Sequence, residues 1–185
     1  MSRTTVADVI VDGLARAGTP RIFLAPAADP GRELADAARR HGLPIVTVSG
    51  AGVACLMAAV TAELSDAPGA AVVSFVPDVV SEAASALTAR VPLLLLTDDA
   101  PRDSGSCVSL ASKAGAGATV RSAARPAAAG VAERSVRLES DSATDAFAHA
   151  LVLAMTEPRG PVQVRLSADL LARDAPRIME ACRPG

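Results

Sequence analysis

Short apolar segments alternate with helical segments along most of this chain, and the alternation constrains the fold more than any other feature. Residues 45–48, 71–76 and 93–96 are apolar apart from single hydroxyl side chains, which is typical of strands buried on both faces. Residues 53–64 and 79–88, which lie between them, carry apolar side chains at helical spacing. Because each parallel crossover needs a helix, the pattern predicts an α/β fold.

The rest of the chain extends this pattern to six strands. Thr5 and Asp8 have the spacing of a capping box, so a helix is predicted from Val6 onward. Further strands are predicted at residues 21–25, 135–138 and 161–166, and further helices at residues 33–40 and 142–155. We therefore expect an open, doubly wound, mainly parallel six-stranded sheet with helices on both faces.

The expected domain covers residues 1–175, and a polar tail follows at residues 176–185. Residues 98–125 interrupt the alternation with Asp, Ser, Gly and Ala, and this composition predicts mainly a long loop.

Composition excludes several classes of partner. The 185 residues are 50% hydrophobic and 21% charged, which is typical of a packed globular protein. Aromatic residues make up 2% and the net charge is -2, so neither base stacking nor phosphate attraction favours nucleic acid. The longest apolar stretch, residues 52–62, is too short to cross a membrane, and the first residues contain no apolar leader. A cytoplasmic protein is expected.

Histidine and cysteine spacing predicts no metal site. The two histidines and three cysteines form neither a C-x-x-C nor an H-x-x-x-H pattern. His41 falls at a predicted helix end beside arginines, and His149 falls inside a helix, so both are interpreted as structural or surface residues. Cys107 lies in the polar loop without a neighbour that marks it as activated.

Gly50 and Gly52 form a G-x-G between a predicted strand and a predicted helix, as a dinucleotide-binding turn requires. The third small position is Cys55, and no acidic residue closes a strand about 20 residues further on. A small nucleotide-binding α/β protein is therefore a weaker alternative. The other interpretation is that the two glycines let a strand turn tightly into a closely packed helix.

Five strings follow one another over nearly the whole chain. They are T-V-A-D with a later A-G in residues 5–18, I-F-L-A-P-A at 22–27, two alanines before D-A-P-G in 54–69, V-P-L-L-L-L-T at 91–97, and R-G-P-V-Q-V before A-D-L in 159–170. Their order and spacing resemble the N-terminal pyrimidine-binding domain of thiamine-diphosphate enzymes of the acetolactate synthase and pyruvate decarboxylase superfamily. The resemblance implies an α/β domain that binds the aminopyrimidine of thiamine diphosphate.

This resemblance also implies which residues shape the pyrimidine pocket. They are Pro26, Gly50, Ala51, Val76, Pro77 and Asp78. The family has a G-P-G sequence where Val76, Pro77 and Asp78 stand, and glycines where its first loop has Leu24 and Ala27 here.

The catalytic position implied by the resemblance is Ala51. In the family, a glutamate at this position hydrogen-bonds the pyrimidine N1′ and promotes removal of the cofactor's C2 proton. If the motif is aligned one residue earlier or later, the position falls on Gly50 or Gly52, so none of the three alignments supplies a carboxylate. A methyl group in its place loses a charge-assisted hydrogen bond of about 1.5–3 kcal/mol. Cofactor activation should therefore be slow, although glyoxylate carboligases carry an aliphatic residue at this position and remain active.

A final implication concerns the missing domains. Family members continue into a central domain and a diphosphate-binding domain whose G-D-G…N motif holds Mg²⁺, and neither is present in the 185 residues. We expect a pyrimidine-side subunit of a split enzyme, comparable with the α chain of sulfopyruvate decarboxylase, acting on a 2-oxo acid or related carbonyl donor. A partner subunit would hold the diphosphate and Mg²⁺, in a homo- or hetero-oligomer. The alternative is a catalytically silent structural or regulatory partner subunit.

Overall fold

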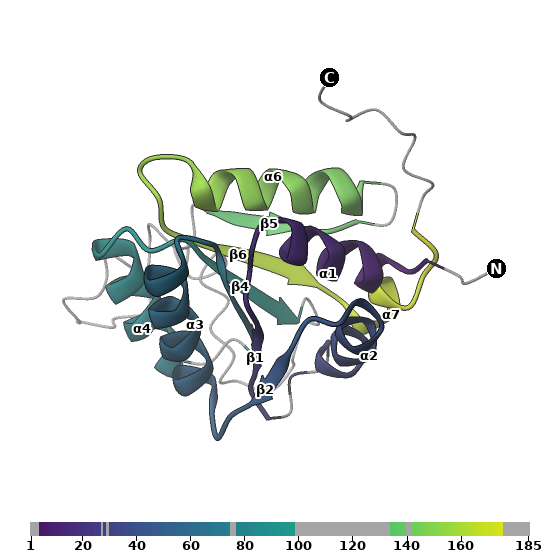
Figure 1. Ribbon diagram of the computed structural model, residues 1–185, viewed down its shortest axis with the longest axis horizontal. Helices are drawn as coiled ribbons and strands as arrows, with labels where there is room; N and C mark the ends of the chain where they lie inside the picture. The colour runs from purple at the N-terminus through teal and green to yellow at the C-terminus, as the bar shows by residue number, and fades with distance from the viewer. Residues whose placement is uncertain are drawn as a thin grey trace, which may run out of the picture.

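The computed structural model of the chain describes residues 4–26, 28, 30–74, 77–98, 134–139 and 142–175, including the backbone but not the side chains of Pro77 and Asp78. Six strands form one sheet in the order β2-β1-β3-β4-β6-β5. They are β1 (Ile22–Leu24), β2 (Ile45–Thr47), β3 (Gly69–Val73), β4 (Leu93–Asp98), β5 (Ser135–Arg137) and β6 (Pro161–Leu166) (Figure 1). Every neighbouring pair is parallel, so the predicted α/β fold is confirmed and the sheet is wholly rather than mainly parallel.

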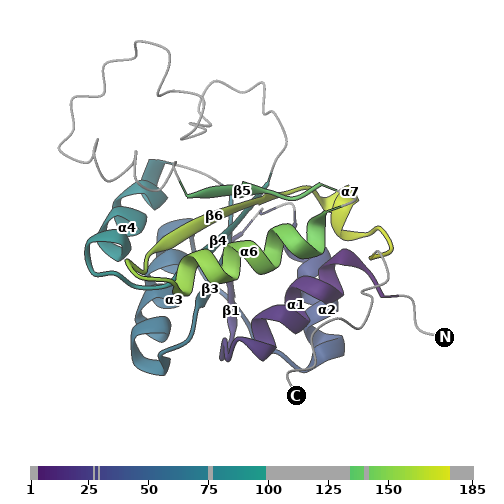
Figure 2. The same cartoon turned by 90° about the horizontal axis from the view of Figure 1, so that it is seen from above.

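Helices cover both faces of this sheet, as predicted. One face carries α1 (Val6–Arg16), α2 (Gly31–His41), α6 (Ala143–Met155) and the short α7 (Ala168–Leu171). The opposite face carries α3 (Ala51–Ser65) and α4 (Pro77–Thr88). Figures 1 and 2 show the two helix groups separated by the strands.

Alternate side chains of the central strands feed two separate cores. Val72 and Leu94 pack with α1, α2 and α6, whereas Ala71 and Leu95 pack with α3 and α4. Successive side chains of a strand point to opposite faces, so a strand buried on both faces must be apolar throughout. This double burial is the physical reason for the continuous apolar segments of the sequence.

A polar junction fastens α1 to α2 on the first face. The predicted capping box is present: Asp8 Oδ2 accepts hydrogen bonds from the Thr5 N–H (2.9 Å) and hydroxyl (2.8 Å). Asp8 Oδ1 also pairs with Arg40 (2.8 Å) and lies 3.3 Å from His41 Nε2 at the end of α2. Burial alone would raise the pKa of Asp8, but the hydrogen bonds from Thr5 and the charge of Arg40 outweigh it and lower the pKa.

Several boundaries differ from the predicted ones. β3 begins at Gly69 rather than residue 71 and ends at Val73, and β4 continues through Asp98 into the segment predicted as a loop. The remainder of that loop, residues 99–125, and the tail at 176–185 lie outside the described residues, as does Cys107. Within the described ranges, no helix is long and apolar enough to span a membrane.

Candidate functional site

The carboxyl ends of β1, β2 and β3 meet at one edge of the sheet. After β1 the chain passes outward to β2, and α3 then carries it back across β1 to β3 on the other side. Open α/β sheets bind ligands at such a switch point, outside the carboxyl ends of the strands. The edge receives three of the predicted segments: Pro26 follows β1, Gly50 and Ala51 follow β2, and the backbone of Pro77 and Asp78 follows β3. Val76 and the side chains of Pro77 and Asp78 lie outside the described residues.

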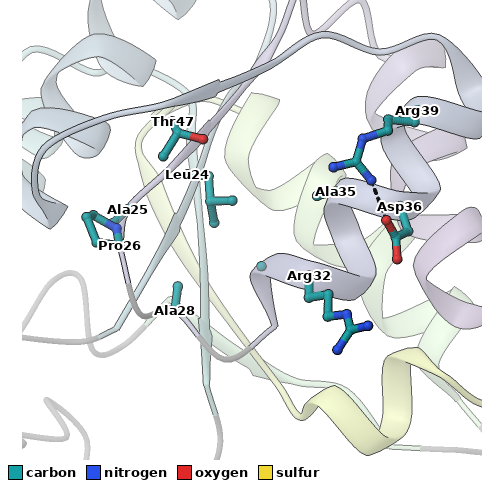
Figure 3. Close-up of a pocket in the computed structure, with 10 residues that line it drawn as sticks. Leu24, Ala25, Pro26, Ala28, Arg32, Ala35, Asp36, Arg39 and Thr47 are labelled. Carbon is teal, nitrogen blue, oxygen red and sulfur yellow. Dashed lines mark hydrogen bonds and ion pairs between the residues drawn. The ribbon is translucent and has the colours of Figure 1, made fainter.

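A shallow pocket of about 230 Å³ lies beside the end of β1 (Figure 3). Its lining residues are Leu24, Ala25, Pro26, Ala28, Gly31, Arg32, Ala35, Asp36, Arg39 and Thr47. Arg39 is paired with Asp36 across one turn of α2, and the wall near Pro26 is aliphatic. Gly50 and Ala51 do not line this pocket, so it includes only one of the described residues predicted for the pyrimidine site.

The turn into α3 is held by its backbone alone. Gly50 is the N-cap, and its carbonyl accepts the Ala54 N–H at 3.0 Å. No side chain caps the helix, and the first turn contains no acidic residue. Ala51 therefore brings only a methyl group to the position where the resemblance implies a glutamate.

The predicted packing role of Gly50 and Gly52 is wrong. A Cβ at Gly50 would meet nothing within 4 Å, and one at Gly52 would make only ordinary contacts at 3.5 Å. The close approach occurs at Gly69 in β3, where a Cβ would lie 2.2 Å from the carbonyl oxygen of Ala58. Gly69 therefore lets the backbone of α3 rest directly on the sheet.

A carboxylate from α4 lies against the first turn of α3. Glu82 Cδ and Oε1 are both 3.5 Å from the Cβ position at Gly52, and Oε2 is 3.8 Å from it. Oε2 is buried and has no hydrogen-bond partner in the described part of the chain. The pKa of the nearby Cys55 thiol is raised to about 12, first by burial and then by the charge of Glu82.

Sequence reasoning missed Glu82, although a signal was present. Glu82 shares the helical spacing i, i+3, i+4 and i+7 with three residues that are buried against the sheet: Val79, Ala83 and Ala86. Glu82 itself is half-buried, but a carboxylate in such a register is unusual, because burying a charge without a partner is unfavourable.

The outer surface of α3 is apolar and exposed. Its exposed large side chains are Val53 (42%), Leu56 (56%), Met57 (40%), Val60 (45%) and Leu64 (83%), and we call these five the α3 stripe. In the described part of the chain, the only other large apolar side chain so exposed is Val152 on α6. A cavity of about 280 Å³ borders the stripe between α3 and α4 and is lined in part by Leu56, Glu63 and Glu82. A contiguous apolar surface of this kind is typical of an interaction site.

The described residues bring no three His, Cys, Asp or Glu side chains together in a way that could hold a metal ion. His41 belongs to the Asp8 junction described above, and His149 lies within α6.

The strand order defines the chain as an open α/β domain whose candidate ligand-binding edge lies at the switch point of the sheet. A family model described as the N-terminal TPP binding domain of thiamine pyrophosphate enzymes matches residues 4–125, and the chain belongs to this family. Among curated proteins, no match is found. The family confirms the predicted resemblance, supports use of thiamine diphosphate, and favours that cofactor over the nucleotide alternative.

The described residues can be tested against the pyrimidine end of thiamine diphosphate. An aminopyrimidine brings ring nitrogens and an amino group that need hydrogen-bond partners in a buried site. Ala51 offers none, whereas Glu82 Oε2 is a buried acceptor without a partner beside the same helical turn. A Cβ at Gly50 would meet nothing within 4 Å and the Glu82 acceptor lies beside Gly52, so the residues at this turn fit the pyrimidine end of the group.

Proposed function

We propose that this chain is the pyrimidine-side subunit of a two-component thiamine-diphosphate-dependent decarboxylase or carboligase, acting on a 2-oxo acid or related carbonyl donor. Membership of the thiamine pyrophosphate enzyme family supports the cofactor. The observation that carries the two-component arrangement is the exposed α3 stripe, which begins two residues after Ala51.

The partner proposed for the stripe is a chain that binds the diphosphate and Mg²⁺. α3 buries Ala54, Ala58 and Ala62 against the sheet and presents the stripe on its other side, so it is apolar on both faces. A helix that is apolar all round is ordinarily buried on all sides. Its 15 residues extend for about 22 Å from the ligand-binding edge. A chain that covers the stripe therefore also lies beside the candidate site, within reach of the rest of the cofactor.

A charged residue beside the stripe indicates which charge the partner surface would carry. Glu63 lies on the exposed side of α3 and lines the cavity together with Glu82. The proposed partner surface is therefore an apolar patch with a flanking arginine or lysine, since opposite charges at an interface set the binding register.

The chain's own part in the reaction is to hold and orient the pyrimidine ring. Thiamine diphosphate, when bound, supplies a nucleophilic carbon that adds to the carbonyl donor and stabilises the resulting negative charge. Pro26, Gly50 and Ala51 would contact the ring from the ends of β1 and β2, while the covered stripe excludes water from the same edge. Val76, Pro77 and Asp78 would complete the pocket after β3.

Charge substitutions on the stripe test this arrangement. The chain is mixed with a diphosphate-binding chain of the same organism that carries the G-D-G…N motif, and assembly is followed by sedimentation velocity. Leu56→Asp and Val60→Asp should abolish a heteromer that the unaltered chain forms. Val152→Asp on α6 is the matched control, because it adds the same charge at a residue of similar exposure (63%) away from the stripe. Equal effects of all three variants, or stable self-association that persists in the mixture, would contradict the proposal.

Ala51 favours a second candidate, a catalytically silent subunit that keeps the fold for assembly. Exchange of the cofactor's C2 proton in the reconstituted complex separates the two functions. Exchange far above that of free thiamine diphosphate supports the enzyme. Exchange that appears only after Ala51→Glu supports the silent subunit.

A further inference from the structure

The candidate site contains one carboxylate that neither its fold nor its neighbours explain. Glu82 is a half-buried residue of α4, and its Oε2 is buried and unpaired in the described part of the chain. An unpaired buried carboxylate oxygen ordinarily costs stability, which makes it a candidate for binding a ligand. The charge of Glu82 raises the pKa of the Cys55 thiol, but a thiol cannot act as a cation and so does not neutralise the carboxylate.

The position of this carboxylate is what connects it with the cofactor. Glu82 is five residues beyond the start of α4 at Pro77, or about 7.5 Å along the helix axis from the ligand-binding edge. Its carboxyl group crosses to α3 and lies within 3.5–3.8 Å of the Cβ position at Gly52, one residue from Ala51. The carboxyl group thus lies in ordinary van der Waals contact with the side-chain position of residue 52. Glycine at position 52 leaves that space to Glu82.

We propose that Glu82 supplies from α4 the carboxylate that residue 51 lacks, and that its Oε2 is the hydrogen-bonding partner of the pyrimidine N1′. This assignment rests on the proposed function. A proton held at Oε2 can be given to the ring nitrogen, which leaves Glu82 ionised, and the same atom can take the proton back.

A purely structural role for Glu82 makes opposite predictions. If the carboxylate served only to interact favourably with the N-terminal end of the α3 dipole, removing its charge would destabilise the isolated chain. If the carboxylate serves to bind a ligand, Glu82→Gln should leave the unfolding midpoint of the isolated chain unchanged or raise it. Glutamine has the same shape as glutamate but carries no charge that must be desolvated.

The main experiment compares two ligands on the reconstituted complex by calorimetry: thiamine diphosphate with Mg²⁺, and the analogue in which the pyrimidine N1′ is replaced by carbon. The unaltered complex should bind thiamine diphosphate at least tenfold more tightly than the analogue. Glu82→Ala should bind the two ligands equally. Glu82→Gln, which cannot transfer a proton, should slow C2 proton exchange at least tenfold. Moving the carboxylate to α3, by combining Glu82→Gln with Ala51→Glu, should restore exchange.

Glu33→Ala and Glu33→Gln are the matched controls, because Oε2 of Glu33 on α2 is likewise buried without a hydrogen-bond partner in the described part of the chain, but on the opposite face of the sheet. Both should behave like the unaltered chain in ligand preference and exchange. If Glu82→Ala keeps the tenfold preference, or if Glu82→Gln lowers the unfolding midpoint of the isolated chain, Glu82 is structural and this assignment is wrong while the proposed function stands. If the unaltered complex binds neither ligand, the proposed function itself is wrong and the assignment fails with it.

Discussion

Gly69→Ala should destabilise the chain by about 2 kcal/mol, because the substitution acts where α3 lies closest to the sheet. The added Cβ would be 2.2 Å from the Ala58 carbonyl oxygen and 2.8 Å from its carbon, and both are backbone atoms that no rotamer change can move. Relieving the contact requires α3 to shift outward by about 1 Å, an overpacking strain of up to about 3 kcal/mol. The lower entropy of the unfolded alanine chain offsets up to about 1 kcal/mol of that strain.

Gly52→Ala is the matched control for this prediction. It makes the same chemical change in α3 itself, where the new Cβ meets only Glu82 at an ordinary 3.5 Å. Since alanine is favoured over glycine inside a helix by up to about 1 kcal/mol, this variant should be as stable as the unaltered chain or slightly more stable. Urea unfolding followed by circular dichroism measures both free energies. If Gly69→Ala lies within about 0.5 kcal/mol of the unaltered chain, the close approach of α3 to β3 does not exist as described.

Two further predictions concern buried groups. Asp8→Asn should lower the free energy of unfolding by about 2 kcal/mol at neutral pH, because Arg40 loses its charged partner. The pKa of Asp8 is lower in the folded than in the unfolded chain, so this contribution is present above the unfolded pKa and is lost as the pH falls through the folded pKa. Urea unfolding of both chains should thus converge in strong acid, and a pH-independent gap would contradict the ion-pair explanation. Cys55 is buried and its pKa is raised to about 12, so it should resist iodoacetamide at pH 8 in the folded chain and react in urea. Mass spectrometry can measure this in a chain that carries Cys107→Ser and Cys182→Ser. Rapid labelling of the folded chain would show instead that Cys55 is accessible.

The fold was predictable because its determinants are local. Each central strand is buried on both faces and therefore apolar throughout, and each helix repeats its apolar side chains at the helical period. The start of β3 was not predictable by the same rules. Glycine normally indicates a turn, but Gly69 belongs to the strand because α3 passes too close for any side chain.

The candidate site was predictable only as far as topology determines it. The family resemblance singled out Pro26, Gly50 and Ala51, and topology brings them together, because parallel strands have their carboxyl ends at one edge of the sheet. The approach of Glu82 to Gly52 depends on how α3 packs against α4, which no local pattern specifies. The sequence does contain a charge at the helical spacing of the buried residues of α4, and such a conflict between pattern and charge is expected at functional sites.

The two faces of α3 explain why the same helix connects packing with function. Its inner face has small side chains, Ala54, Ala58 and Ala62, which together with Gly69 bring the helix backbone onto the sheet. Its outer face has the larger side chains of the α3 stripe, which is the reverse of an ordinary surface helix. The inner contact and a partner on the outer face would therefore fix the same rigid element, whose first turn carries Ala51. It follows that Gly69→Ala should weaken the proposed heteromer and the binding of thiamine diphosphate together, whereas Val152→Asp on α6 should change neither.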